Sequence, residues 1–598
     1  MILAAFSLWC VAGIALAVLS GDDDGARLQR LILDAYQAGT GKAVIPPGTY
    51  RLRSPARDAE ASLYFKGLKN FTIEAAGATF VCEDRVTGWG RFDDCDGVTI
   101  WGGTVRHDPA PFSQGRITAI GADRLSVDVR IDAGYAADLS DTAFFFPSGS
   151  GWLDLFDPAT REWKRGAADL DFASFEPLGA ASYRFTLREA LRPGYPIAVG
   201  DPVAWRGVIA PDLLLQNCRK MRVEGATFQS SSGFCVSEYA GEGDNFYRYT
   251  VERAPVPTGA KELPLLASNA DAFHSNSVRH GPTLDGCVFS HMDDDGVPIH
   301  GGQTLVVGGG GSSVVLAVRK GDAAFGIAGR PGDVLHFYDE AGALAGEGTV
   351  ASVAALAGYK PRQPPPNPFA SFQAPSDLVY LNLTLTAIPA AAPRFGWLAV
   401  NAAASGAGYA VRHCTIRGNR GRGMLLNAPG GVVEDCLVEG TTMAGIALAP
   451  EMEAWPQSDY SRGVALRRNT LRDVYTSWQN GFFEAGALTI AEWRKDRYPP
   501  LPGGHRDIVV EGNTFENDDG PNVVVASARG VAFRGNRFVG AMRHASDRGH
   551  YVGVPEGALY WITESDGVTV EGNAIEQPGP FLKTDVLPSK TAKVEVKN

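Results

Sequence analysis

One pattern of hydrophobic and polar positions recurs along most of this chain. Each copy has two apolar residues at alternate positions, a polar residue with glycine, one small, asparagine or cysteine residue, and then another apolar residue. The copies are Val98–Val105, Met221–Phe228, Thr283–Phe289, Ala410–Ile416, Val432–Val438, Val464–Leu471, Ile508–Phe515, Val531–Phe538 and Val568–Ile575. The alternation predicts short strands with one buried face, and the small-residue slot predicts a bend between them.

The spacing of this bend slot indicates how the strands are stacked. Its later members are Cys414, Cys436, Asn469, Asn513, Asn536 and Asn573, separated by 22, 33, 44, 23 and 37 residues. Values near 22, its double and lengthened versions fit the coils of one solenoid with variable loops. We therefore predict an all-β chain, a right-handed parallel β-helix whose asparagines stack into a ladder. A β-sandwich with regular turns is the alternative, but it gives no reason for one slot to stay small, Asn or Cys.

Residues 22–110 are predicted to hold a cap helix and the first coils. Asp22–Asp24 can cap a helix with an apolar face, which comprises Leu28, Leu31, Ile32 and Ala35. The strand pattern Ala43–Leu52 follows, with the sequence Ile-Pro-Pro-Gly-Thr-Tyr inside it. This order resembles the start of many secreted parallel β-helices, where the helix covers the open end of the solenoid.

Two segments break the repeat, at residues 111–212 and 303–404. Both alternate like antiparallel strands and lack the bend slot. We predict an inserted β-barrel-like domain in each, with coils of the β-helix over residues 213–302 and 405–598. The insertions either wall a groove or are peripheral, and the sequence leaves both interpretations open.

Composition and termini narrow the classes of function. Residues 1–21 are apolar and contain a small-x-small site at Ala15–Ala17, which predicts a signal peptide and a secreted, periplasmic or cell-surface protein. No later apolar run is long enough to span a bilayer. The net charge of -12 excludes a nucleic-acid partner, because a polyanion groove needs a basic excess. Nothing in the sequence indicates an oligomeric state.

The cysteines divide into two groups. Cys287, Cys414 and Cys436 share the bend slot, which favours buried packing over disulfides. Cys82 and Cys95 are the predicted disulfide for an oxidising compartment. No Cys or His spacing is typical of zinc, and we predict neither a metal nor another cofactor.

Two acidic motifs lie one predicted coil apart. Asp271 is in the stretch Asn269–His274, and Asp294 and Asp295 are in His291–Gly302, with 24 residues between Asp271 and Asp295. Stacked coils place such residues at strand spacing, roughly 4.8 Å. Carboxylates held that close push their pKa values apart, and glycosidases use this to keep one as acid and another as base. A solvated turn or a calcium site is the alternative, although no EF-hand or nonapeptide pattern is present.

These motifs resemble glycoside hydrolase family 110, which comprises secreted exo-acting α-1,3-galactosidases of the type that removes the blood-group-B galactose. The resemblance is carried by Asp271–Gly281 with Cys287–Gly301, and by Met443–Trp455, and it covers most of the chain. It implies a β-helix with two barrel insertions. The chain departs from the family pattern at Pro298, where asparagine is expected, and at Pro456–Ser458, where an acidic residue is expected.

The resemblance also implies a reaction, which is hydrolysis with inversion of terminal α-1,3-linked galactose on an oligosaccharide or glycoconjugate. By similarity to polygalacturonases, Asp294 would protonate the leaving oxygen, while Asp271 and Asp295 would hold and deprotonate water. The gap between acid and base in such enzymes is about 6.5–9.5 Å.

Three further residues are candidates for substrate binding. His274 and His300 could hydrogen-bond sugar hydroxyls and Trp455 could stack on galactose, with structural roles as the alternative for each. Two rival functions also remain. A polygalacturonase-like hydrolase of other sugar specificity needs basic residues beside the carboxylates, and a non-catalytic β-helical glycan-binding surface protein predicts that the three aspartates do not converge.

Overall fold

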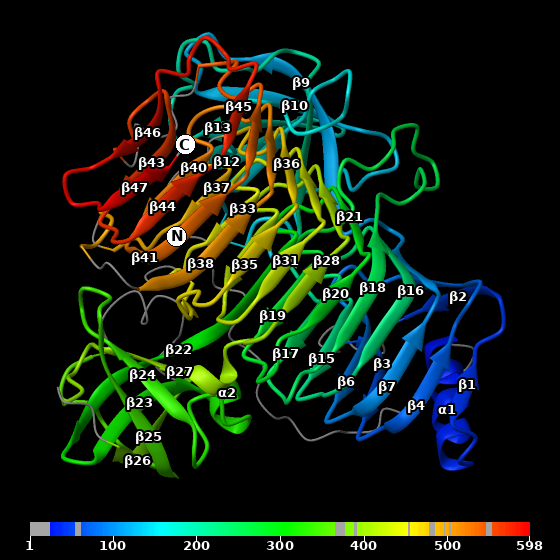
Figure 1. Cartoon of the computed structure of the whole chain (residues 1–598). Coiled ribbons are helices and arrows are strands. Elements are labelled where there is room, and N and C mark those ends of the chain that lie inside the picture. The colour runs from blue at the N-terminus through cyan, green and yellow to red at the C-terminus, as the bar shows by residue number, and fades with distance from the viewer. Residues whose placement is uncertain are drawn as a thin grey trace.

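Parallel strands of successive coils stack into a long β-helix that forms the body of the molecule (Figure 1). The computed structural model describes residues 24–53, 61–147, 149–364, 377–387, 392–452, 455–477, 485–494, 497–500, 504–545 and 553–597. The fold class predicted from the sequence is confirmed. The predicted signal peptide, residues 1–21, lies outside the described residues. In the part of the chain that the structure describes, no helix has both the length and the apolar character needed to cross a membrane.

Three columns of strands form the walls of the β-helix. The first column is β1 (Lys42–Val44), β4 (Lys69–Glu74), β7 (Asp96–Trp101), β16 (Arg222–Gln229), β18 (Phe246–Val251), β20 (Thr283–Asp285), β28 (Ala410–Arg412), β31 (Val432–Glu434), β35 (Ala465–Arg467), β38 (His505–Glu511), β41 (Ala528–Arg534), β44 (Val568–Glu571) and β47 (Val594–Lys597). The second is β2 (Gly48–Leu52), β5 (Ala78–Cys82), β8 (Thr104–His107), the second halves of β16 and β18, β21 (Val288–Ser290), β29 (Thr415–Arg417), β32 (Leu437–Glu439), β36 (Thr470–Arg472), β39 (Thr514–Glu516), β42 (Arg537–Val539) and β45 (Ala574–Glu576). The third is β3 (Ala61–Lys66), β6 (Gly88–Asp93), β15 (Leu213–Gln216), β17 (Val236–Tyr239), β19 (Phe273–Asn276), β22 (Val297–Gly310), β30 (Met424–Asn427), β33 (Ile446–Leu448), β37 (Leu488–Ile490), β40 (Val523–Ala526), β43 (Ala558–Thr563) and β46 (Thr584–Pro588).

The bend between the first and second columns carries the predicted ladder. The side-chain oxygen of Asn513 accepts hydrogen bonds from the backbone N–H and the Nδ2 of Asn469, at 2.9 and 3.0 Å. Asn536 and Asn573 repeat this pattern on the next two coils. Each amide nitrogen also donates to a backbone carbonyl of a preceding coil, as Asn513 Nδ2 does to Leu466 at 2.9 Å. The ladder therefore satisfies buried turn groups that no strand pairing reaches.

Cysteines continue the same ladder toward the N-terminus. The backbone N–H of Cys436 donates to Asn469 Oδ1 at 3.0 Å, and that of Cys414 donates to the sulfur of Cys436 at 3.4 Å. All seven cysteines of the described residues are free and buried. The predicted Cys82–Cys95 disulfide is therefore wrong. Cys95 instead faces Cys218, which occupies the equivalent turn of a neighbouring coil.

The helix α1 (Asp24–Gln37) covers the first coils, as predicted. Leu28 and Ile32 are fully buried in the core of the β-helix. The carboxylate of Asp24 accepts a hydrogen bond at 2.8 Å from the backbone N–H of Arg51 in β2, which ties the helix to the first coil.

Two antiparallel barrels of six strands each interrupt the coils, and parts of both can be followed in Figure 1. The first consists of β9 (Phe112–Ile120), β10 (Ser126–Ile131), β11 (Gly151–Leu155), β12 (Leu170–Gly179), β13 (Ser182–Leu187) and β14 (Pro202–Arg206). The second consists of the end of β22 with β23 (Ser313–Arg319), β24 (Val334–Tyr338), β25 (Leu344–Ala355), β26 (Leu378–Ala387) and β27 (Leu398–Asn401), with the short helix α2 (Lys320–Ala324). The pairing orders are β9-β10-β13-β12-β11-β14 and β22-β23-β26-β25-β24-β27, and both close on themselves. The two insertions therefore share one topology.

The asparagine ladder generates a stability prediction. Replacing Asn513 by leucine, in the interior of the ladder, leaves the donors of Asn469 and the Leu466 carbonyl unpaired. We expect a loss of about 3 kcal/mol in the free energy of unfolding, because buried polar groups without partners cost about 1–3 kcal/mol each. Asn573→Leu, on the last and partly exposed rung, is the matched control and should cost about 1 kcal/mol. Denaturant unfolding followed by circular dichroism measures both, and equal losses would contradict the cooperative ladder.

Candidate active site

The two acidic motifs lie side by side, just before two neighbouring strands in the middle of the third column. Asp271 precedes β19 and Asp295 precedes β22, and these strands pair in register with Ser275 opposite Ile299. The turn before the strands is also paired, since the Ala272 N–H donates to the carbonyl of Asp295 at 3.3 Å. The predicted placement on adjoining coils is therefore correct.

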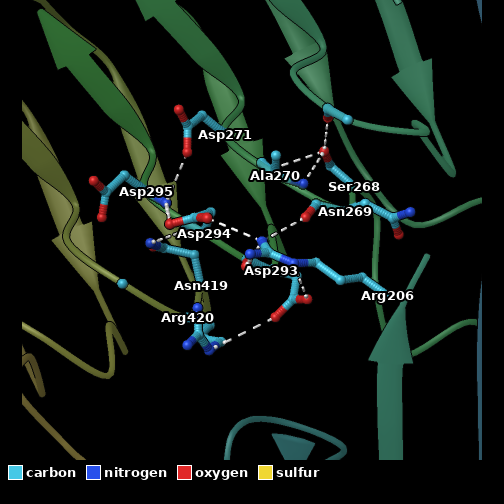
Figure 2. A network of polar contacts seen from close by, with 12 residues as sticks. Arg206, Ser268, Asn269, Ala270, Asp271, Asp293, Asp294, Asp295, Asn419 and Arg420 are labelled. Atoms are coloured by element: carbon cyan, nitrogen blue, oxygen red, sulfur yellow. Dashed lines mark hydrogen bonds and ion pairs between the residues drawn. The ribbon is translucent and has the colours of Figure 1, made fainter. Parts of the chain in front are cut away.

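The three predicted catalytic aspartates meet around one backbone N–H group (Figure 2). The N–H of Asp295 donates to Asp271 Oδ1 at 3.1 Å and is 3.2 Å from Asp294 Oδ1. One oxygen from each of the three carboxylates lies within 4.8 Å of the others. The side chain of Asp294 is 32% exposed, whereas those of Asp271 and Asp295 are each 6% exposed. Only Asp294 is thus open to direct contact with a large substrate.

Two arginines neutralise part of this charge. Arg422, from the next coil, donates its backbone N–H to Asp295 Oδ1 at 2.6 Å and its Nη1 to Asp295 Oδ2 at 3.3 Å. Its other terminal nitrogen donates to Glu451. Arg206 Nη1 donates to Asp294 Oδ2 at 2.9 Å. Among the described residues Asp271 forms no ion pair with an arginine, and burial together with the charges of Asp294 and Asp295 raises its pKa well above the ordinary value.

Arg206 is delivered to the site by the first barrel, at the end of β14. The same Nη1 also donates to the carbonyls of Asn269 and Asp293, at 2.9 and 3.1 Å, so one side chain holds both acidic motifs (Figure 2). The ring of Trp152, in β11 of that barrel, lies 4.8 Å from the guanidinium carbons of Arg206 and Arg420. The first barrel therefore forms part of the site.

The first aspartate of the triplet has a different environment. Asp293 is fully buried and points toward the first barrel, with Arg206 Nε at 3.8 Å and Arg420 Nε at 3.9 Å. Burial raises its pKa to about 7. Its carboxyl is beside the buried Asp154 of β11, and burial together with the charge of Asp293 raises the pKa of Asp154 well above its ordinary value. Asp293 therefore joins the barrel to the β-helix and does not face a substrate.

The two predicted sugar-binding histidines lie behind Asp271. His274 Nδ1 is 2.7 Å from Asp271 Oδ2, and His274 Nε2 is 3.2 Å from His300 Nε2. His300 Nδ1 is 2.9 Å from the Gly301 carbonyl. The ring of Phe234 covers His274, with centroids 4.5 Å apart. All four ring nitrogens of these histidines already have protein partners. Their binding of sugar hydroxyls stays a prediction.

Trp455 lies on a loop that runs beside the site. Its side chain is 38% exposed. Two residues later, β34 (Gln457–Ser458) pairs antiparallel with Gly301–Gly302 of β22, next to His300. The preceding Glu451 binds Arg422, so the loop is anchored at both ends to residues of the site. Stacking of Trp455 on galactose stays a prediction.

Arg206 and Arg422 are the functional residues that the sequence analysis did not find. Arg206 is 88 residues from Asp294 and belongs to an inserted barrel, so no motif spacing links them. Arg422 had a signal, because it lies one coil after Asp295 at the start of β30, as Asp295 lies one coil after Asp271. Arg279, by contrast, forms an ion pair with Asp333 next to β24 in the second barrel, which indicates a structural role.

Comparison with known proteins places this geometry in context. No protein-family model matches the chain. The chain is 22% identical over 550 residues to the α-1,3-galactosidase B of Akkermansia muciniphila, which covers 86% of this chain and 64% of the relative. It is 23% identical over 562 residues to the α-1,3-galactosidase A of Bacteroides fragilis, covering 91% and 85%. The chain thus spans less than two thirds of the Akkermansia relative.

Among solved structures, the catalytic unit of the GH87 α-1,3-glucanase from Streptomyces thermodiastaticus superposes with a TM-score of 0.43 at 11% identity, over 97% of this chain and 65% of that one. A third relative, the α-1,3-galactosidase B of Bacteroides thetaiotaomicron, is 21% identical over 497 residues, covering 79% of this chain and 74% of the relative. Similarity to proteins named α-1,3-galactosidase thus extends over most of the chain, and it confirms the resemblance to glycoside hydrolase family 110.

Proposed function

We propose that this protein is an exo-acting glycoside hydrolase that removes terminal α-1,3-linked galactose from oligosaccharides or glycoconjugates, with inversion of configuration. The observation that carries the proposal is the convergence of three aspartates from adjoining coils, one of them exposed and two buried behind it. The names of the relatives supply the sugar and the linkage. Export of the protein is a further proposal and depends on the leader-like residues 1–21.

In the proposed reaction Asp294 protonates the glycosidic oxygen, because it is the carboxyl that a substrate can reach. Asp295, with Asp271 beside it, orients a water molecule and removes its proton as the water attacks the anomeric carbon. Arg422 holds Asp295 as a carboxylate through two hydrogen bonds, which suits a base.

Burial favours attack by water over attack by a carboxylate. A retaining enzyme needs a carboxylate oxygen that reaches the anomeric carbon. Both oxygens of Asp271 and both of Asp295 already have protein partners, and each side chain is 6% exposed. The closest oxygens of the trio are within 4.8 Å, below the expected gap of about 6.5–9.5 Å. Inversion is therefore proposed from burial and from the family resemblance, not from the separation.

The two rival functions fit the site less well. A uronate-specific hydrolase needs basic side chains for the substrate carboxylate, and the two guanidinium groups at the trio are paired with Asp294, Asp295 and Glu451. A purely glycan-binding protein has no need to gather three carboxylates, since their mutual repulsion costs stability.

Substitution of the acid and the base generates a prediction that separates their roles. Asp294→Asn and Asp295→Asn should each lower kcat/KM on the blood-group-B trisaccharide by about 10²–10⁴-fold. On p-nitrophenyl α-galactoside, whose leaving group needs little protonation, Asp294→Asn should lose less than about tenfold, whereas Asp295→Asn should lose as much as on the trisaccharide. Asp285→Asn, in the same coil but on its outer surface, is the control and should match the wild type. Full activity of Asp295→Asn would remove the proposed base.

The stereochemistry of the first product gives an independent prediction. Single displacement on an α-galactoside releases β-galactose, which then mutarotates. Proton NMR of the anomeric signals during the first minutes of hydrolysis should show β-galactose before α-galactose. Early accumulation of α-galactose would contradict inversion and leave the hydrolase assignment standing.

A further inference from the structure

A hydrogen-bond chain runs from the Gly301 carbonyl through His300 and His274 to Asp271. It determines whether the Asp271 carboxyl carries a proton. A backbone carbonyl can only accept, so His300 Nδ1, at 2.9 Å from the Gly301 carbonyl, carries a hydrogen. The Nε2 of a neutral His300 then accepts, and the hydrogen in the 3.2 Å contact belongs to His274 Nε2. The Nδ1 of a neutral His274 accepts in turn, and its partner at 2.7 Å, Asp271 Oδ2, must supply the hydrogen.

The surroundings favour this neutral arrangement over an imidazolium–carboxylate pair. Burial lowers the pKa of His274 well below its ordinary value, and lowers that of His300 to about 4. Phe234 covers one face of His274, and Arg319 disfavours a positive charge on His300.

The groups facing Asp271 act in the same direction. Asp294 and Asp295 oppose a negative charge on it, and Arg206 offsets this only in part. The remaining oxygen, Asp271 Oδ1, accepts the N–H of Asp295 and needs no charge to do so. A protonated Asp271 therefore satisfies every contact that it makes.

We propose that Asp271 is the neutral, proton-carrying member of the trio, a positioning residue held in that state by His274 and His300, and that Asp295 alone is the base. The inference depends on the proposed function and refines it. During the reaction the attacking water gives one proton to Asp295 and forms the new bond to the anomeric carbon. The bond to the glycosidic oxygen breaks, and that oxygen takes the proton of Asp294. The proton of Asp271 is not transferred, and its role is to fix the Asp294–Asp295 turn through the Asp295 N–H.

Asparagine is the test substitution, because its amide reproduces a protonated aspartate. In Asp271→Asn the side-chain oxygen can accept the Asp295 N–H while Nδ2 donates to His274. We expect kcat/KM on the B trisaccharide to fall by less than about tenfold, with KM unchanged. The acidic limb of the pH profile should also be unchanged, because we assign that limb to Asp295. Asp271→Ala, which loses both contacts, should lose at least about 10²-fold in kcat, and the asparagine variant should restore most of that loss.

Two outcomes distinguish this inference from the proposed function. A loss in Asp271→Asn equal to that in Asp295→Asn would overturn the inference and leave the proposed function intact. Undiminished activity of Asp294→Asn and Asp295→Asn on the trisaccharide would instead refute that function.

Stability against pH tests the same proton without activity. The unfolded chain releases the Asp271 proton near its ordinary pKa of about 3.9, whereas the folded protein keeps it to higher pH, so this residue destabilises wild type increasingly as pH rises. Asp271→Asn removes that dependence. We expect the melting temperature of Asp271→Asn, measured relative to wild type, to rise with pH from pH 5 upward, until the folded wild type also loses the proton. A relative melting temperature that does not change with pH above pH 5 would show that folded Asp271 is already ionised, and would refute the proposal.

Discussion

The structure depends on in-register hydrogen bonding between successive coils. Because each coil repeats the backbone path of the one before, a residue in a turn lies against its equivalent on the next coil. Equivalent asparagines gain from this stacking, since each amide satisfies the coil beside it. Equivalent aspartates lose, since their charges are brought to within a few ångströms. The same constraint thus stabilises the bend and concentrates charge at the site.

The inserted barrels complete the site around these carboxylates. The second leaves the third column directly through β22, whose first residues follow the acidic turn. The first leaves the β-helix after His107 and returns before Asp212, and these two residues form a fully buried pair at 2.8 Å that closes its base. That closure brings β14 back over the coils and places Arg206 against Asp294. The first insertion therefore contributes a side chain to the candidate site, as well as contributing to the shape of the molecule.

The sequence predicted the contacts that follow from the coil repeat, but not the contacts that the inserted barrels make. The bend slot predicted the ladder from Cys414 to Asn573, and the 24-residue spacing predicted contact between Asp271 and Asp295, because both are consequences of one period. The Cys82–Cys95 disulfide was wrong because Cys95 follows the same stacking rule and meets Cys218 on an adjacent coil. The position of Arg206 could not be predicted, because a contact made through a folded barrel leaves no periodic pattern in the sequence.

The balance of charge at the trio explains why one of its members needs a proton. Three carboxylates converge, and in the part of the chain that the structure describes Arg206 pairs with Asp294, while Arg422 pairs with both Asp295 and Glu451. Ionisation of all three would bring three negative charges together in a mostly buried site, where a poorly compensated charge costs several kcal/mol. Asp294 is next to Arg206 and reaches solvent, and Asp295 is next to Arg422. Asp271 has neither advantage, and its neighbours are neutral histidine rings, so the proton is held most tightly there.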